Sequence, residues 1–391
     1  MLFFKRADIF RSLFFMIKLL GNREAYSSKI LEKIIGFVGI DKIPYPAKWT
    51  FIDIMAGTGS VARKFKMAGF KIIANDTCYQ NYIYNSGLFE MGTKCGLKNL
   101  AEYLSPGNKK NKDFYHRDEL VTDYLNKLTP FNGFITQNYT KGKAKYFDTD
   151  YAQMIDSCRI IIEKWFIENH INEYEKNYLI AGLLEVASNN AHIRSNWMCA
   201  NYGMDFHYDF RYHSLYTTAK LHDTQKRGGD VTRHCVSNFD ATKIYDTKYD
   251  NTILFIDPPY QLSRNYCTYY DVPITIAKYD SPELKGDRKR RADKGGFPSS
   301  IFNHKKTYVD GLKQILNHTR AKYVVGCFMR NDDSYSFSDL NPLMEAMAGY
   351  AKKRFARYEI PIQNAVTDKP YAPWRRTTRN KYPLNLFCIE R

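Results

Sequence analysis

The stretch Trp49-Thr-Phe-Ile-Asp-Ile-Met-Ala-Gly-Thr-Gly-Ser60 joins an apolar run to a loop of small residues. We expect a buried strand over 49–55, a helix over 61–68 and a second strand over 70–74 that ends at Asn75-Asp76. Strand, glycine turn, helix and strand in this order open a doubly wound α/β sheet. Glycines after a buried strand let a ligand approach the backbone, as in dinucleotide, phosphate and nucleoside sites.

The same alternation returns in the second half of the chain. Short strands are expected over 233–236, 252–256 and 323–328, with helices over 304–318 and 338–349. The last two strands, near 354–360 and 383–390, have no helix between them, which predicts an antiparallel hairpin at one edge of a mostly parallel sheet. The fold class is therefore α/β with a Rossmann-like sheet.

A stretch of about 140 residues between the two halves, 95–230, does not alternate in this way. Apolar residues recur there at steps of three and four over 150–190, which predicts helices. We therefore divide the chain into a first half of the sheet domain (1–94), a mainly helical insertion (95–230) and a second half of the sheet domain (231–391).

The composition is that of a folded, basic protein. Lysine and arginine number 58 against 41 acidic residues, a net charge of +17, which favours a polyanionic partner such as nucleic acid. The eight cysteines are scattered, as in a reducing cytoplasm, and no Cys or His pair has metal-ligand spacing, so no metal is expected. Charges interrupt the apolar N-terminus after every few residues, so we predict an amphipathic cap, not a signal peptide or membrane span.

The most specific signal is Asp257-Pro-Pro-Tyr260, which follows the apolar run 252–256. Two consecutive prolines restrict the backbone and donate no hydrogen bonds, so the carbonyl groups of Asp257 and Pro258 are available as acceptors. A carboxylate and a carbonyl side by side match the two hydrogens of an exocyclic NH₂ group. Tyr260 adds a ring face on which a flat heteroaromatic base can stack.

The glycine loop taken alone is less specific. No lysine follows at the spacing of an NTP-binding loop, and the third glycine of a nicotinamide-binding loop is missing. Asp76, at the end of the second strand, suits the two hydroxyl groups of a ribose. These features favour a nucleoside-type cofactor.

Together these motifs resemble the S-adenosylmethionine-dependent DNA adenine methyltransferases that modify the exocyclic amine. The resemblance covers most of the chain: 18–23 is similar to the N-terminal cofactor motif, 53–59 to the glycine motif, 238–241 to the element before the catalytic strand and 257–260 to the catalytic tetrapeptide. Segments within 133–159 and 265–279 are also similar, whereas Arg23 stands where the family more often has lysine. The order implies the alpha arrangement, in which 95–230 is a target-recognition domain.

The resemblance implies S-adenosylmethionine as cofactor and a set of site residues. The catalytic set is Asp257, Pro258, Pro259 and Tyr260. The cofactor-binding set is Lys18, Gly21, Asn22, Asp53, Ala56, Gly57, Gly59, Asp76 and Asp240.

Basic stretches at 104–145, 285–306 and 353–381 are candidates for contact with DNA phosphates. The phosphate-binding set is Arg288, Lys289, Arg290, Arg291, Lys305, Arg375 and Arg376. Candidates for base contacts in the insertion are Arg194, His207, Arg211, His213, Lys226 and Arg227.

The sequence thus predicts a cytoplasmic, sequence-specific adenine methyltransferase of a restriction–modification or phage system. Its partners would be double-stranded DNA and a cognate restriction endonuclease, with no membrane. Two alternatives stay open at this point: an RNA adenine or protein-glutamine methyltransferase, and a non-catalytic DNA-binding protein on the same fold.

Overall fold

The structure is a computed structural model that describes residues 23–40, 48–91, 96–193, 197–200, 209–216, 220–221, 234–243, 251–259, 265–303, 306–330, 339–362 and 382–391. The N-terminal cap expected before residue 23 lies outside these ranges.

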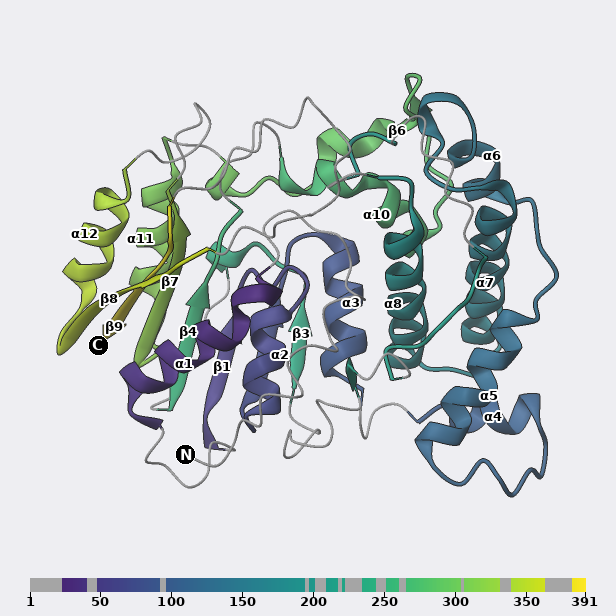
Figure 1. The fold of residues 1–391 in the computed structure, drawn as a ribbon, viewed down its shortest axis with the longest axis horizontal. Coiled ribbons are helices and arrows are strands. Elements are labelled where there is room, and N and C mark those ends of the chain that lie inside the picture. The colour runs from purple at the N-terminus through teal and green to yellow at the C-terminus, as the bar shows by residue number, and fades with distance from the viewer. Residues whose placement is uncertain are drawn as a thin grey trace.

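The described residues form a seven-stranded sheet with the strand order β3-β2-β1-β4-β7-β9-β8 (Figure 1). Neighbours from β3 to β7 are parallel, and β9 is antiparallel to both β7 and β8. This confirms the mostly parallel sheet with an antiparallel hairpin at one edge. The strands are β1 (Thr50–Asp53), β2 (Lys71–Asn75), β3 (Cys235–Ser237), β4 (Thr252–Ile256), β7 (Tyr323–Met329), β8 (Arg354–Ile360) and β9 (Leu384–Glu390).

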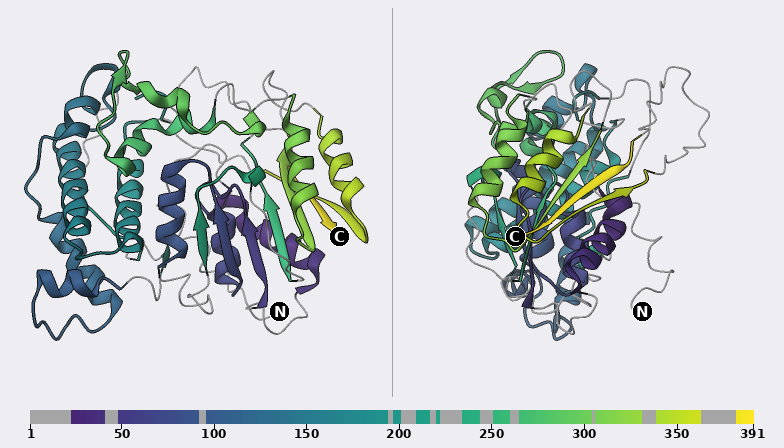
Figure 2. Two further views of the ribbon diagram at one scale, coloured as in Figure 1. Left: turned by 180° about the vertical axis from the view of Figure 1, so that it is seen from behind. Right: turned by 90° about the vertical axis from the view of Figure 1, so that its left-hand side faces the viewer.

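Helices cover both faces of the sheet, so its central strands β1, β4 and β7 are buried throughout. In β4, Ile253 and Phe255 pack with the helices on one face, and Leu254 and Ile256 pack with those on the other. Figure 2 shows α1 on the side of the sheet opposite to α11 and α12. The first face carries α1 (Ser27–Val38), α2 (Ser60–Met67) and α3 (Tyr79–Phe89), and the second α11 (Tyr308–His318) and α12 (Asn341–Tyr350).

The insertion is helical, as its periodicity predicted, and α3, α8 and α7 follow one another away from the sheet (Figure 1). Its buried residues belong to the same hydrophobic cluster as α1, α2 and α3. Glu185 of α8 forms a buried ion pair with Lys220 (2.8 Å) and accepts a hydrogen bond from Tyr84 of α3 (2.8 Å). A role in target recognition stays a prediction. The helices are α4 (Lys98–Leu104), α5 (Phe114–Asn126), α6 (Phe134–Tyr139), η5 (Gly142–Ala144), α7 (Thr149–Ile167) and α8 (Glu173–Asn190).

Short elements lie between β4 and α11 in the chain. After β4 come the 3-10 helix η8 (Tyr266–Tyr270), α10 (Asp271–Lys278) and a small hairpin of β5 (Leu284–Lys285) and β6 (Arg290–Arg291). No helix within the described ranges is long and apolar enough to span a bilayer. The remaining 3-10 helices are η2 (Glu24–Tyr26), η7 (Ala241–Lys243), η9 (Ala292–Gly296) and η10 (Ile301–Asn303).

The close packing of α3 on α8 yields a stability prediction. A Cβ atom added at Gly87 would lie 2.7 Å from the Cβ atom of Ala181, so Gly87→Ala should reduce the free energy of unfolding by about 1–3 kcal/mol through overpacking. Gly36→Ala, on the exposed side of α1 with nothing within 4 Å, is the matched control and should stabilise by about 0.5–1 kcal/mol. Denaturant melts measure both. Equal effects of the two substitutions would contradict tight packing between insertion and sheet domain.

Candidate active site

Four acidic residues of the predicted site follow four neighbouring strands. Asp53 ends β1, Asp76 comes directly after β2, Asp240 comes after β3, and Asp257 comes directly after β4. These strands are adjacent and parallel, so their carboxyl ends meet at one edge of the sheet, where open α/β sheets bind ligands. The fold therefore brings together acids as far apart in the chain as Asp53 and Asp257.

The glycine loop turns sharply between β1 and α2. Gly57 and Gly59 both have left-handed backbone conformations, with φ of 54° and 68°. A Cβ atom on Gly59 would lie 2.3 Å from Oδ1 of Asn85 in α3, whereas a Cβ atom on Gly57 would meet nothing within 4 Å. Gly59 thus lets the loop pack on α3, and Gly57 borders open space.

Asp76 ties the glycine loop to the end of β2. Its Oδ2 accepts a hydrogen bond from the backbone N–H of Gly57 (2.8 Å), and its Oδ1 accepts one from the N–H of Cys78 (2.8 Å). Burial raises the pKa of Asp76 to about 6, against the lowering effect of these two hydrogen bonds. Nearby, the N–H of Ala56 donates to the carbonyl of Asn75 (2.9 Å), which continues the contact between loop and strand.

Asp53, the last residue of β1, lies at the same edge of the sheet. Its side chain is buried, and among the described residues Oδ1 has no hydrogen-bond partner. Burial, and secondly the charge of Asp257, raise the pKa of Asp53 well above its usual range. A buried carboxylate oxygen that has no partner among the described residues fits a ligand that carries hydrogen-bond donors.

Asp257 is held by Arg23 in a two-pronged ion pair. Nε of Arg23 donates to Oδ2 of Asp257 (2.7 Å), and Nη2 donates to Oδ1 (2.8 Å). The two side chains are only 10% and 12% exposed, so water screens the pair weakly. The sequence placed Arg23 in the N-terminal motif but did not include it in the site, because nothing local in the sequence indicates a contact with a residue beyond the insertion.

Asn75 is a further residue that the sequence did not single out. Its Nδ2 donates to the carbonyls of Ile54 and Phe239 (both 3.0 Å), and its Oδ1 accepts from the N–H of Phe239 (2.9 Å) and the hydroxyl of Ser237 (2.8 Å). One buried amide therefore joins the ends of β1, β2 and β3. Its position directly before Asp76 was the only signal available.

Asp240 stands at the start of η7. Its Oδ1 accepts hydrogen bonds from the N–H (2.8 Å) and the hydroxyl (2.7 Å) of Thr242. The ring of the preceding Phe239 is 64% exposed, which is unusual for a large apolar side chain. The structure thus presents an exposed ring beside an anchored carboxylate.

The other predicted residues of the site divide into two groups. Pro258 is buried and Pro259 is half-buried directly after Asp257. The remaining four lie outside the described residues, namely Lys18, Gly21, Asn22 and Tyr260.

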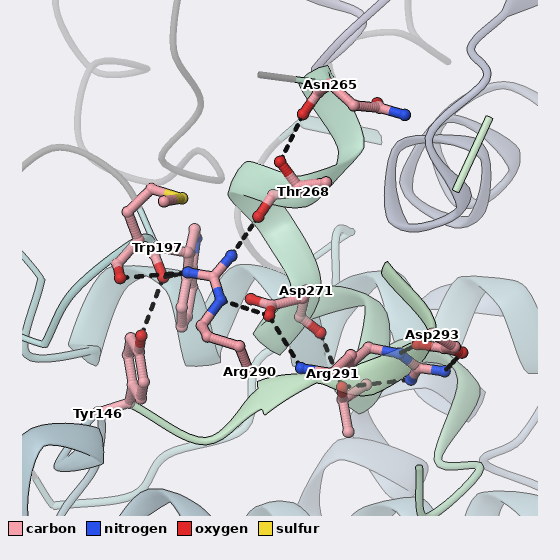
Figure 3. Close-up of polar contacts among 10 residues, drawn as sticks. Tyr146, Trp197, Asn265, Thr268, Asp271, Arg290, Arg291 and Asp293 are labelled. Atoms are coloured by element: carbon pink, nitrogen blue, oxygen red, sulfur yellow. Dashed lines mark hydrogen bonds and ion pairs between the residues drawn. The ribbon is translucent and has the colours of Figure 1, made fainter. Parts of the chain in front are cut away.

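The basic segment after α10 departs from the sequence expectation. Arg288 and Lys289 are exposed in the turn between β5 and β6, but Arg290 and Arg291 are buried. Figure 3 shows that Arg290 forms an ion pair with Asp271 and donates to the carbonyls of Trp197 (3.3 Å), Met198 (3.1 Å) and Thr268.

Arg291 is also paired internally. It forms ion pairs with Asp293 (2.8 Å) and Asp280 (2.7 Å). The guanidinium groups of Arg290 and Arg291 thus satisfy internal acceptors, which corrects the expectation that all four basic residues face phosphates.

Two of the other candidates for DNA contact lie within the described residues. Of the base-contact candidates, Arg211 is exposed and His213 is half-buried, and burial lowers the pKa of His213. The rest lie outside the described residues, namely Lys305, Arg375, Arg376, Arg194, His207, Lys226 and Arg227.

Comparisons with known proteins agree with this geometry. The family model of D12 class N6 adenine-specific DNA methyltransferases matches residues 40–325. The Type II methyltransferase M.FokI of Planomicrobium okeanokoites is 30% identical over 240 residues, which is 60% of this chain and 34% of that protein. The Type II methyltransferase M.NlaIII of Neisseria lactamica is 27% identical over 313 residues, which is 79% of this chain and 81% of that protein.

A third relative is the modification methylase LlaI of Lactococcus lactis subsp. lactis, which is 29% identical over 266 residues, 67% of this chain and 39% of that protein. The chain thus spans little more than a third of M.FokI and LlaI and most of M.NlaIII. The family match covers both the glycine loop and the Asp257 tetrapeptide. The chain belongs to the family of D12 class N6 adenine-specific DNA methyltransferases.

Proposed function

We propose that this protein transfers the methyl group of S-adenosylmethionine to the exocyclic amine of adenine at a specific sequence in double-stranded DNA. The observation that carries the proposal is Asp257, which Arg23 holds at the same sheet edge as the glycine loop and Asp76. Membership of the family supports this activity. The Type II names of the relatives support a place in a restriction–modification system, with a cognate endonuclease and a cytoplasmic site of action.

The edge of the sheet beside the glycine loop offers hydrogen-bond acceptors that suit S-adenosylmethionine. When bound, S-adenosylmethionine supplies an electrophilic methyl group on a sulfonium. Asp76 is placed to accept hydrogen bonds from ribose hydroxyls, and the unpartnered Oδ1 of Asp53 to accept them from an ammonium group. Asp240 and the exposed ring of Phe239 suit an adenine amine and an adenine face. Lys18, Gly21, Asn22, Ala56, Gly57 and Gly59 complete the proposed cofactor site.

The catalytic tetrapeptide acts on the target base. The lone pair of an adenine amine is delocalised into the ring, so the amine is a weak nucleophile. The carboxylate of Asp257 and the carbonyl of Pro258 accept its two hydrogens and orient it, and Asp257 faces the positive charge that builds on nitrogen. One proton then leaves to water. Pro259 keeps the backbone fixed, and Tyr260 stacks on an adenine that has been flipped out of the duplex.

Arg23 acts as a positioning residue for Asp257. An ionised carboxylate has about four lone-pair sites, so two hydrogen bonds from a guanidinium leave it able to accept another from the target amine. The forked ion pair fixes the carboxylate plane, which a single ammonium cannot do. This gives a physical role to the arginine that stands where the family more often has lysine.

Removal of the Asp257 carboxylate should abolish catalysis but not binding. Asp257→Ala is expected to lower the methyl-transfer rate by at least 10²–10³-fold, because a preorganised charged acceptor is lost. Transfer of labelled methyl groups to DNA measures the rate, and long-read sequencing of DNA from expressing cells reports methyladenine and its context. A wild-type protein that marks no DNA, or an Asp257→Ala variant with near-normal turnover, would refute the proposed function.

Substitutions of Arg23 test its positioning role. Arg23→Ala should lower kcat more than it raises KM, and Arg23→Lys should restore part of kcat because the charge returns without the fork. A double-mutant cycle with Asp257→Asn, measured on the free energy of unfolding, should show coupling of roughly 0.5–3 kcal/mol. Additive effects on stability would mean that Arg23 does not act through Asp257.

The pKa of Asp76 predicts how cofactor affinity depends on pH. The raised pKa, about 6, means that Asp76 is ionised at pH 7.5 and becomes protonated as the pH falls through 6. Protonation removes a charged acceptor, so the Kd for S-adenosylmethionine should rise between pH 7 and pH 5, as titration calorimetry can measure. Asp76→Asn should bind more weakly at pH 7.5 and lose this dependence. If the variant kept it, the titrating group would be a neighbour such as Asp53.

The same shift has a consequence for stability. Since the folded-state pKa of Asp76 lies above its usual value, its contribution to stability is greatest at low pH and is lost as the pH rises through 6. Loss of the buried charge should therefore favour the folded Asp76→Asn variant at pH 7.5, but its amide leaves a single acceptor oxygen for the N–H groups of Gly57 and Cys78, which costs about 1–3 kcal/mol. A thermal melt at pH 7.5 should show that the variant is folded before its affinity for S-adenosylmethionine is compared with that of the wild type.

A further inference from the structure

The β5–β6 hairpin carries a compact set of exposed charges. Residues 285–289 are all exposed, and three of them, Lys285, Arg288 and Lys289, are cationic. Gly286 and Lys289 have left-handed backbone conformations, with φ of 70° and 50°, and the N–H of Lys289 donates to the carbonyl of Gly286 (3.1 Å). The turn is therefore closed and points its side chains outward.

The two-residue strand β6 of this hairpin is held by buried contacts. Arg290 and Arg291 follow the turn directly, and their exposed fractions are 8% and 1%. Figure 3 shows both guanidinium groups surrounded by acceptors of the same molecule, including Asp271 and Asp293. Two buried, charge-paired arginines fix where the turn lies, which lowers the entropy lost when it binds a partner.

Arg290 also connects the hairpin to the catalytic segment and to the insertion. It donates to the carbonyl of Thr268 in η8, which begins a few residues after the tetrapeptide, and to those of Trp197 and Met198 in the insertion. The hydroxyl of Tyr146 donates to the same Trp197 carbonyl (3.0 Å), as Figure 3 shows. Arg290 thus fixes the hairpin both to η8 and to the backbone of the insertion.

The turn also lies against a second basic loop. Lys143 of η5 forms an ion pair with Asp287 at the tip of the turn (2.8 Å), and in Figure 1 β6 lies next to α6, which precedes η5. Lys141 and Lys143 are exposed. The structure thus joins the basic stretches 104–145 and 285–306, which the sequence analysis treated separately. We call Lys141, Lys143, Lys285, Arg288 and Lys289 the turn surface.

We propose that the turn surface binds the phosphate backbone of double-stranded DNA beside the target adenine, independently of base sequence. This inference rests on the proposed function. Exposed, flexible cations around a fixed turn suit phosphates, which carry charge but no base information. Arg290 and Arg291 are positioning residues that hold the turn beside the catalytic segment.

The test removes two charges from the turn. Arg288→Ala/Lys289→Ala should flatten the slope of log Kd against log salt by nearly two and weaken binding about 10- to 30-fold at 0.15 M salt. The loss should be the same for DNA with and without the methylated site. Fluorescence anisotropy with labelled duplexes measures Kd.

The control removes the same charge elsewhere. Lys313→Ala/Lys352→Ala changes two exposed lysines outside the three basic stretches, one in α11 and one just before β8, both elements lying at the end of the molecule away from β6 in Figure 1, and should leave the salt slope unchanged. Equal slopes for the two double variants would overturn the inference, as would a loss confined to the cognate site. If the wild-type protein transfers labelled methyl groups to DNA, such a binding result would leave the proposed function intact.

A substitution of opposite sign adds an independent check. Asp287→Asn removes the acid at the tip of the turn, so it should tighten DNA binding a few-fold. Binding equal to or weaker than wild type would place the tip away from phosphates and overturn the inference.

Discussion

The structure depends on the concentration of carboxylates at one edge of a parallel sheet. Asp53, Asp76 and Asp257 stand at the carboxyl ends of β1, β2 and β4, and all three are largely withdrawn from water. Burial raises the pKa of Asp53 most, and the nearby charges of Asp257 and Asp76 raise it further. Burying several carboxylates together costs free energy unless hydrogen bonds or cations stabilise each of them.

The three acids have different hydrogen-bond partners. Asp257 has a cation, Arg23, whereas Asp76 has two backbone N–H groups, and Asp53 has one oxygen left without a partner among the described residues. These different environments are the basis of the roles proposed above for the three acids. Hydrogen-bond donors within the protein already meet Asp257 and Asp76, whereas Asp53 keeps an acceptor that a bound ligand could use.

The insertion is more than an appendage to this edge. Its helix α8 packs directly on α3, and the Glu185–Lys220 pair with Tyr84 places polar bonds inside that interface. Arg290 adds a second connection, between the backbone of the insertion and η8. The insertion is therefore attached to the rest of the protein at two places, one at α3 and one at η8.

Much of the fold could be predicted from the sequence. Strand β4 coincides with the predicted 252–256, and the edge hairpin of β8 and β9 was also expected, because a continuous apolar run and the absence of an intervening helix are local signals. The boundaries of the elements were predicted less accurately, since α11 begins at Tyr308 and not at 304. The chemistry of Asp257-Pro-Pro-Tyr260 stays a prediction, which rests on the restriction that consecutive prolines place on the backbone whatever surrounds them.

What only the tertiary structure decided is which charges meet. The sequence could not show that Arg23 reaches Asp257, or that Lys143 reaches Asp287, because each pair is separated by other elements. Nor could it separate Arg288 and Lys289 from Arg290 and Arg291: the four form one basic run, yet the first two are exposed and the last two buried. Charge is a property of the residue, but burial and partnership are set by the packing of distant segments. Tertiary structure therefore determines which basic side chains hold the fold and which are available to DNA.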